Sequence, residues 1–179
     1  MNRNLIFRNI GRFALLMLLQ VLVLNNVYLG GYITPFLYVL FIAMLPTNTN
    51  RIAMLLIAFA SGLCFDIFSN MLGFHAFACT LTAFVRIMGA QRIIKRDDDE
   101  IETPSIRSGS YQHFIVYLLV LLLVYNLAYY ILSVFSFREL PQILLSTVLS
   151  TVITALLAIL YQTLLIHRPQ AGGMNQKMH

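Results

Sequence analysis

The chain has 179 residues, of which 59% are hydrophobic and 11% are charged. An ordinary soluble domain carries roughly 25% charged residues, so this composition excludes a typical soluble protein and predicts an all-α membrane protein. A net charge of +5 would suit nucleic acid, but the basic residues fall between apolar segments, which is typical of membrane topology. We therefore expect no nucleic acid partner.

The first apolar segment, Phe13–Leu24, follows Arg3, Arg8 and Arg12. It begins like a signal peptide, but the residues after it offer no small-x-small cleavage site, so we predict an uncleaved spanning helix. The second apolar segment, Ile33–Leu45, is short for a span and contains Pro35, which predicts a kink or an irregular start. Because non-helical backbone inside a membrane must be covered by protein, we expect other helices around it.

Four further apolar segments follow, and the last two exceed the roughly 20 residues that a spanning helix needs. The polar stretch 91–110, which includes the acidic run Asp97–Glu102, is expected to be a flexible cytoplasmic loop, and residues from about 168 to 179 a disordered tail. Residues 1–179 then form a single membrane domain. The four segments are Ile52–Phe65, Phe74–Met88, Phe114–Phe135 and Ile143–Ile166.

The positive charges predict the topology. Six crossings with the N-terminus inside place eleven of the twelve basic residues in the cytoplasm and leave only Arg138 outside. If the second segment did not cross, the loop that carries Arg86 to Arg107 would lie outside. The pattern therefore predicts six spanning helices with both termini in the cytoplasm.

Polar residues at similar depth in several helices predict a cluster near the outer face. Asp66 lies fifteen residues beyond Arg51, or about 22 Å along an untilted helix, and a carboxylate at this depth needs a partner. The nearest candidate is His75. The cluster could be a hydrogen-bonded clasp between helix ends, a binding site for a partner protein, or a small-ligand pocket. Its expected members are Asp66, His75, Asn126, Asn25 and Tyr32.

Small residues in rows predict where helices approach closely, because lipid provides no hydrophobic drive between spanning helices. The longest row lies in the last apolar segment at i, i+4 spacing, and shorter rows lie in the third and fourth segments. We therefore expect the third, fourth and sixth helices to form the packed centre. The expected packing residues are Ala58, Gly62, Gly73, Ser146, Ser150, Thr154 and Ala158.

One stretch of the sequence resembles a known family. Its features are a proline in the second apolar segment, an arginine before the third, a G-hhh-D pattern, a short turn and the sequence LGFHAF. Together they resemble the MreD family of rod shape-determining proteins, and six predicted spans in about 180 residues agree with this. The residues that carry the resemblance are Pro35, Arg51, Gly62, Asp66, Gly73 and His75.

The resemblance implies a non-catalytic scaffold in the bacterial inner membrane, without a cofactor or metal. Members of that family bind MreC and work with RodA, penicillin-binding protein 2 and MreB in peptidoglycan synthesis along the side wall. The family is also thought to share a fold with the substrate-binding subunits of vitamin-uptake transporters.

Such a vitamin-binding subunit is the alternative function, although Ala14 is followed at i+4 by Leu18 rather than by the alanine typical of those subunits. A proton-coupled transporter using Asp66 and His75 is a third hypothesis, but the sequence shows no internal repeat.

Overall fold

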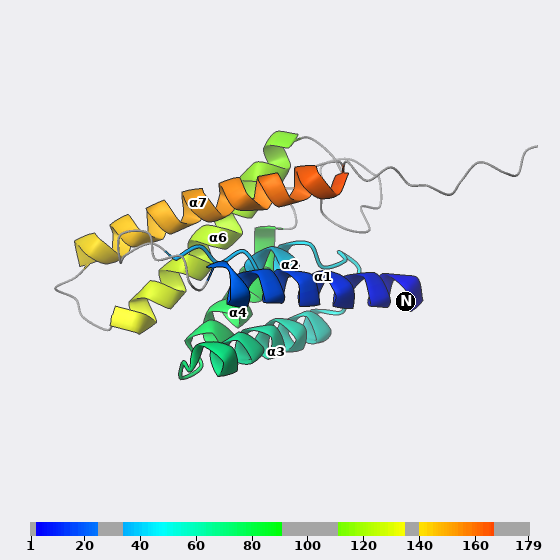
Figure 1. Ribbon diagram of the computed structural model, residues 1–179, viewed down its shortest axis with the longest axis horizontal. Coiled ribbons are helices and arrows are strands. Elements are labelled where there is room, and N and C mark those ends of the chain that lie inside the picture. The colour runs from blue at the N-terminus through cyan, green and yellow to red at the C-terminus, as the bar shows by residue number, and fades with distance from the viewer. Residues whose placement is uncertain (1–2, 25–33, 91–110, 135–139, 167–179) are drawn as a thin grey trace, which may run out of the picture.

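The computed structural model describes residues 3–24, 34–90, 111–134 and 140–166 (Figure 1). These parts are mostly helical and contain no strand. The expected loop at 91–110, with Asp97–Glu102, and the expected tail lie outside the described residues, as do Asn25 and Tyr32. The elements are α1 (Arg3–Leu22), α2 (Val39–Ala43), α3 (Arg51–Ser69), α4 (Phe74–Val85), the π-helical turn η2 (Arg86–Ala90), α6 (Tyr111–Val134) and α7 (Leu140–Ile166).

Among the described residues, three helices are long and apolar enough to cross a membrane: α3, α6 and residues Leu140–Leu164 of α7. Two further apolar helical stretches are shorter, Asn9–Leu22 and Phe74–Gly89. The all-α class is thus confirmed, and the three helices support a membrane protein. The six-span topology stays a prediction.

The second apolar segment forms only a short helix rather than a continuous spanning helix. Residues 34–38 are non-helical, and α2 has five residues. The chain is nevertheless buried from Pro35 to Leu45. A residue that precedes proline is disfavoured in helical conformation, so Pro35 marks an irregular stretch ahead of α2 instead of a kink within a helix.

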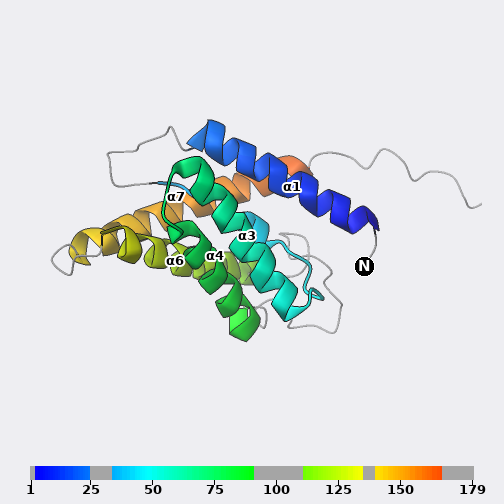
Figure 2. The ribbon, with the colours of Figure 1, turned by 90° about the horizontal axis from the view of Figure 1, so that it is seen from below.

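The long helices pack in the order α3, α4, α6 and α7, and the short α2 contacts both α4 and α6. α4 packs against both α3 and α6, α6 packs against α7, and α1 lies on α2 and α3 (Figure 2). The expectation that the third, fourth and sixth helices form the centre is therefore wrong in part. α6, the fifth predicted span, takes the central place because its tyrosines, including Tyr117 and Tyr125, are buried against α2 and α4.

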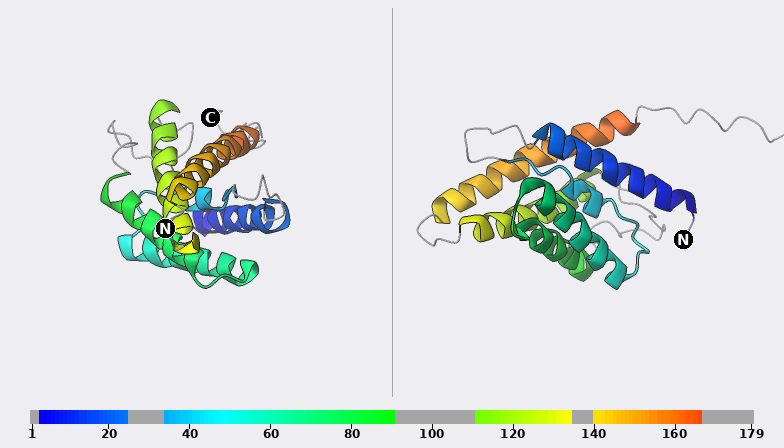
Figure 3. Two further views of the ribbon diagram at one scale, coloured as in Figure 1. Left: turned by 90° about the vertical axis from the view of Figure 1, so that its left-hand side faces the viewer. Right: turned by 60° about the horizontal axis from the view of Figure 1, so that its bottom comes forward.

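The start of α1 and the end of α7 lie at the same end of the molecule (Figures 1 and 3). This arrangement is compatible with two termini on one side of a membrane. The opposite end contains the turn between α3 and α4, where Asn70 and Gly73 have φ values of 54° and 85°.

Candidate functional site

Asp66 caps the N-terminus of α4. It lies in the last turn of α3 and is 2% exposed. Its carboxylate accepts the backbone N–H of His75 at 3.1 Å and that of Ala76 at 2.8 Å. The first N–H groups of a helix have no partner within the helix and form its positive end. The prediction that the His75 side chain compensates Asp66 is therefore wrong, because His75 contributes its backbone N–H.

Gly62 brings the two helices close enough for this contact. It precedes Asp66 by one turn, and a Cβ atom there would lie 2.5 Å from the carbonyl oxygen of His75 and 2.6 Å from the Cα of Ala76. Gly73 ends the connecting turn at φ 85°, a conformation that glycine adopts without a steric penalty. These residues form one unit, which we call the α3–α4 joint: Gly62, Asp66, Gly73, His75 and Ala76.

The His75 ring belongs to a buried network with two tyrosines. Its Nδ1 lies 2.5 Å from the hydroxyl of Tyr125 and 3.3 Å from that of Tyr38, and the two hydroxyls are 2.6 Å apart. The ring also stacks on Tyr129 with 4.6 Å between centroids. The network therefore joins α4 to α6 and to the residue that precedes α2. The sequence did not predict these tyrosines, since their hydroxyls carry no pattern.

Asn126 connects α6 to α7 instead of joining Asp66. Its Nδ2 donates to the carbonyl of Leu122 at 2.9 Å and to Oγ1 of Thr151 at 3.1 Å. The structure thus divides the expected cluster: Asp66 and His75 lie at the α3–α4 joint, and Asn126 faces α7. The other two expected members, Asn25 and Tyr32, lie outside the described residues.

The small-residue row of α7 binds the irregular backbone ahead of α2. The N–H of Phe36 donates to Oγ1 of Thr154 at 3.2 Å, and the N–H of Thr34 donates to Oγ of Ser150 at 3.3 Å. Ser146 and Ala158 of the same row are buried as well. The row was expected to allow close helix packing, but its hydroxyls also replace hydrogen bonds that this backbone lacks.

Gln20 of α1 holds the same backbone from the other side. Its Oε1 accepts the N–H of Leu37 at 2.7 Å, and its Nε2 donates to the carbonyl of Pro35 at 2.9 Å. Sequence reasoning missed Gln20, although a lone amide within the apolar run FALLMLLQVLVL was an available signal. The Pro35 segment is therefore covered by protein, as expected.

Arg86 is a buried cap rather than a cytoplasmic loop charge. It is fully buried, and its guanidinium donates to the carbonyls of Ile42 and Leu45 at the end of α2. The hydroxyl of Tyr117 donates to the carbonyl of Ala43 at 2.8 Å. The last carbonyls of a helix lack partners and form its negative end, which a cation stabilises. The topological count placed Arg86 in a loop because a sequence does not show such pairing.

These contacts favour a clasp role for the buried polar side chains, both for Asp66 and for residues outside the expected cluster. Asp66, Gln20, Arg86 and Thr154 each bind backbone groups of another element. Within the described residues, no group of three or more His, Cys, Asp and Glu side chains could hold a metal ion. The polar groups are thus arranged to fix the helices relative to one another.

Comparison of the chain with models of known families, with curated proteins and with solved structures finds no significant match.

Proposed function

We propose that the protein is a non-catalytic scaffold of the bacterial cell-shape machinery, located in the inner membrane, which binds MreC and supports peptidoglycan synthesis along the side wall. One observation carries the proposal. The polar residues that could have formed a reactive or ligand site, Asp66, His75 and Asn126, each make hydrogen bonds within the chain. Such an arrangement suits a protein that presents a fixed surface to partners.

The resemblance to the MreD family gains support from the same contacts. Four of the residues that carry it, Gly62, Asp66, Gly73 and His75, build the α3–α4 joint. The motif therefore has a physical role, which is to place two apolar helices in close contact. On this proposal RodA, penicillin-binding protein 2 and MreB are further members of the same assembly.

The vitamin-binding alternative has less support. It would use a polar pocket near Asp66 and Asn126, whose carboxylate and amide N–H groups already bind the chain itself. One pocket that the described residues form lies between α1, α2 and α3; its wall is mostly apolar, and neither Asp66 nor Asn126 lines it.

The proposal is tested by expressing the chain with tagged MreC in a rod-shaped bacterium that lacks its own MreD. We expect MreC to co-purify and rod shape to return. If the chain is present in the membrane at a normal level but MreC does not co-purify and rod shape does not return, the proposal is contradicted.

Two variants separate a clasp from a partner site at Asp66. If Asp66 is a clasp, Asp66→Asn should lower thermal stability while the amount of MreC bound per folded molecule stays unchanged. Loss of MreC at unchanged stability would instead make the carboxylate a partner site. Asn50→Ala is the control, because it removes a helix cap at an exposed position, the N-cap of α3.

A further inference from the structure

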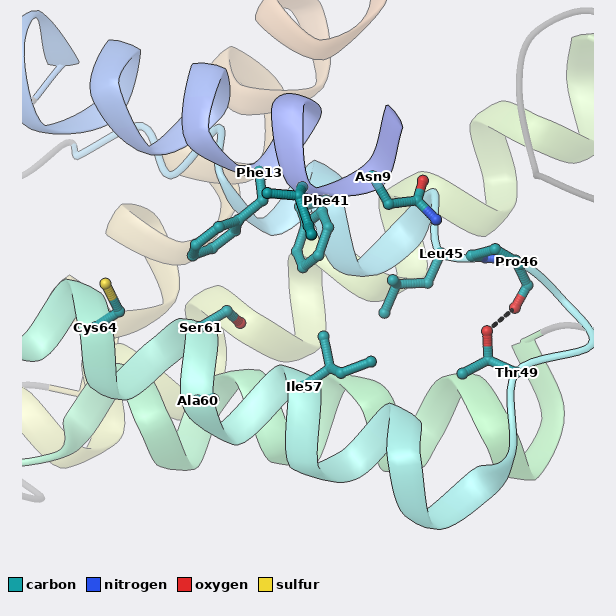
Figure 4. Close-up of a pocket in the computed structure, with 11 residues that line it drawn as sticks. Asn9, Phe13, Phe41, Leu45, Pro46, Thr49, Ile57, Ala60, Ser61 and Cys64 are labelled. Atoms are coloured by element: carbon teal, nitrogen blue, oxygen red, sulfur yellow. Dashed lines mark hydrogen bonds between the residues drawn. The ribbon is translucent and has the colours of Figure 1, made fainter. Parts of the chain in front are cut away.

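A pocket of about 300 Å³ lies between α1, the end of α2 and α3 (Figure 4). Phe13 of α1 and Phe41 of α2 form part of its wall, with ring centroids 4.9 Å apart. Leu45 follows α2, and Ile57 lines the pocket from α3. A gap of this size between apolar helices has room for an apolar occupant.

The wall of the pocket is suited to hydrocarbon. Oγ1 of Thr49 donates to the carbonyl of Pro46, and Oγ of Ser61 donates to that of Ala58, each at 2.8 Å. The protons of both hydroxyls are therefore already used. Apolar cavities without free polar partners stay dry, and one of about 150 Å³ takes up a benzene-sized molecule. This pocket has room for a longer apolar chain.

The surroundings of the pocket are positively charged at one end. The first acidic residue of the chain is Asp66, so residues 1–65, which build most of the wall, carry only positive charges. Asn9 of α1 and Thr49, which precedes α3, both lie on the side of the pocket away from Cys64 (Figure 4). Arg51 is exposed two residues after Thr49, at the positive N-terminal end of α3. An anion is favoured there.

We propose that this pocket binds one acyl chain of an anionic phospholipid, with the lipid phosphate near Arg51. The lipid fills the space between α1 and α3 and holds α1 against the rest of the molecule. α3 is apolar enough to cross a membrane, so the acyl chain reaches the pocket without leaving the bilayer. This site is separate from the α3–α4 joint and does not depend on MreC.

The chain contains no tryptophan, so one introduced tryptophan is a unique fluorophore. Phe13→Trp places it in the pocket wall, and Phe59→Trp places the control on the exposed face of α3. Both variants are put into phosphatidylcholine nanodiscs with rising fractions of phosphatidylglycerol that carries brominated acyl chains. We expect Phe13→Trp to reach half-maximal quenching at about a fivefold lower fraction than Phe59→Trp, the effect of one basic residue near anionic lipid. Equal quenching at every fraction would overturn the proposal.

Further substitutions in the Phe13→Trp background identify the site. Ala60→Phe fills the pocket and should abolish the quenching at low phosphatidylglycerol fractions. Leu56→Phe, on the exposed face of the same helix, should leave that quenching unchanged. Ala60→Leu serves if the larger ring prevents folding. Arg51→Gln should remove the preference for phosphatidylglycerol over brominated phosphatidylcholine. If quenching at low phosphatidylglycerol fractions persists in the Ala60→Phe variant, the acyl chain does not bind in this pocket.

Native mass spectrometry identifies the occupant directly. Protein released from phosphatidylglycerol-containing nanodiscs should retain one phospholipid, and the Ala60→Phe variant should lose it. Retention of a second copy of the chain in place of a lipid would show that the pocket serves an interface between copies, and would overturn the proposal.

Discussion

At Asp66, two backbone N–H groups of α4 replace the water that a carboxylate would otherwise bind. A buried charge is tolerated only when it is paired or well hydrogen-bonded. The helix terminus provides both bonds and a favourable field, so no basic side chain is needed. Gly62 allows Asp66 to reach these groups, because a side chain in place of Gly62 would separate α3 from α4.

Replacement of Gly62 by alanine should destabilise the protein. The new Cβ would meet backbone atoms of His75 and Ala76 at 2.5–2.7 Å, and backbone yields less readily than a side chain. We expect a loss of about 1–3 kcal/mol in unfolding free energy, measured by denaturant titration in detergent micelles. Gly11→Ala is the matched control, because a Cβ there meets nothing within 4 Å and alanine favours helix. Equal effects of the two changes would refute the close contact.

A double-mutant cycle distinguishes the helix cap from an ion pair. Asp66→Asn should cost about 1–3 kcal/mol, because an amide N–H₂ then faces a backbone donor. His75→Phe keeps the backbone N–H that Asp66 binds, so the cost of Asp66→Asn should be the same in both backgrounds within about 0.5 kcal/mol. If Asp66→Asn instead restores stability to His75→Phe, the imidazole is the partner of the carboxylate.

Among the elements, the segment from Thr34 to Leu45 depends most on the others. Only α2 is regular in it. Its carbonyls accept hydrogen bonds from Gln20 of α1, Arg86 of η2 and Tyr117 of α6, and its N–H groups donate to hydroxyls of α7. Unsatisfied backbone groups cost several kcal/mol in a bilayer. The segment therefore holds its shape only while the surrounding helices are in place.

Thr154→Val tests this dependence with little change in volume. The substitution leaves the N–H of Phe36 without its acceptor, and we expect a loss of about 1–3 kcal/mol in unfolding free energy. The control is Thr163→Val, since the Thr163 hydroxyl is exposed and bonds only to Leu160 of its own helix. The two variants are compared by thermal unfolding in the same detergent, and the interpretation fails if Thr163→Val costs as much as Thr154→Val.

At the scale of the whole molecule, the outer surface is apolar over long helical stretches. Leu56 and Ile67 of α3 are 63% and 73% exposed, and Leu156 and Leu164 of α7 are 63% and 66% exposed. Soluble monomers rarely present continuous apolar surface of this kind. A lipid environment accounts for it.

Reporter fusions test the predicted six-span topology. Alkaline phosphatase fused after residue 105 or residue 179 should be inactive, because both positions are expected in the cytoplasm, whereas a fusion after residue 137 should be active. The basic residues of the stretch 91–110 are the reason for this expectation. Green fluorescent protein at the same positions should give the opposite pattern. An active phosphatase after residue 105 would mean that the second apolar segment does not cross.

The sequence predicted some parts of the candidate site and missed others for a physical reason. Asp66, Gly62 and Gly73 stood out because a charge or a glycine is unusual in apolar helices, and rows of small residues follow helical spacing. Gln20, Tyr38 and Arg86 were missed or misplaced, because the groups they bind lie 15 to 87 positions away along the chain. No local pattern encodes such pairs.

Composition and periodicity by themselves predicted an all-helical membrane protein. The reason is that an apolar segment long enough to cross the bilayer is stable there as a helix because of its own residues. The tertiary structure decided that the second segment forms a short helix and that α6 lies at the centre. It also decided that Asp66 binds the backbone N–H groups of α4 rather than the imidazole of His75. These outcomes depend on which backbone N–H and C=O groups still lack a hydrogen-bond partner after the helices have packed. The sequence does not show this, because it depends on the positions of all the helices together.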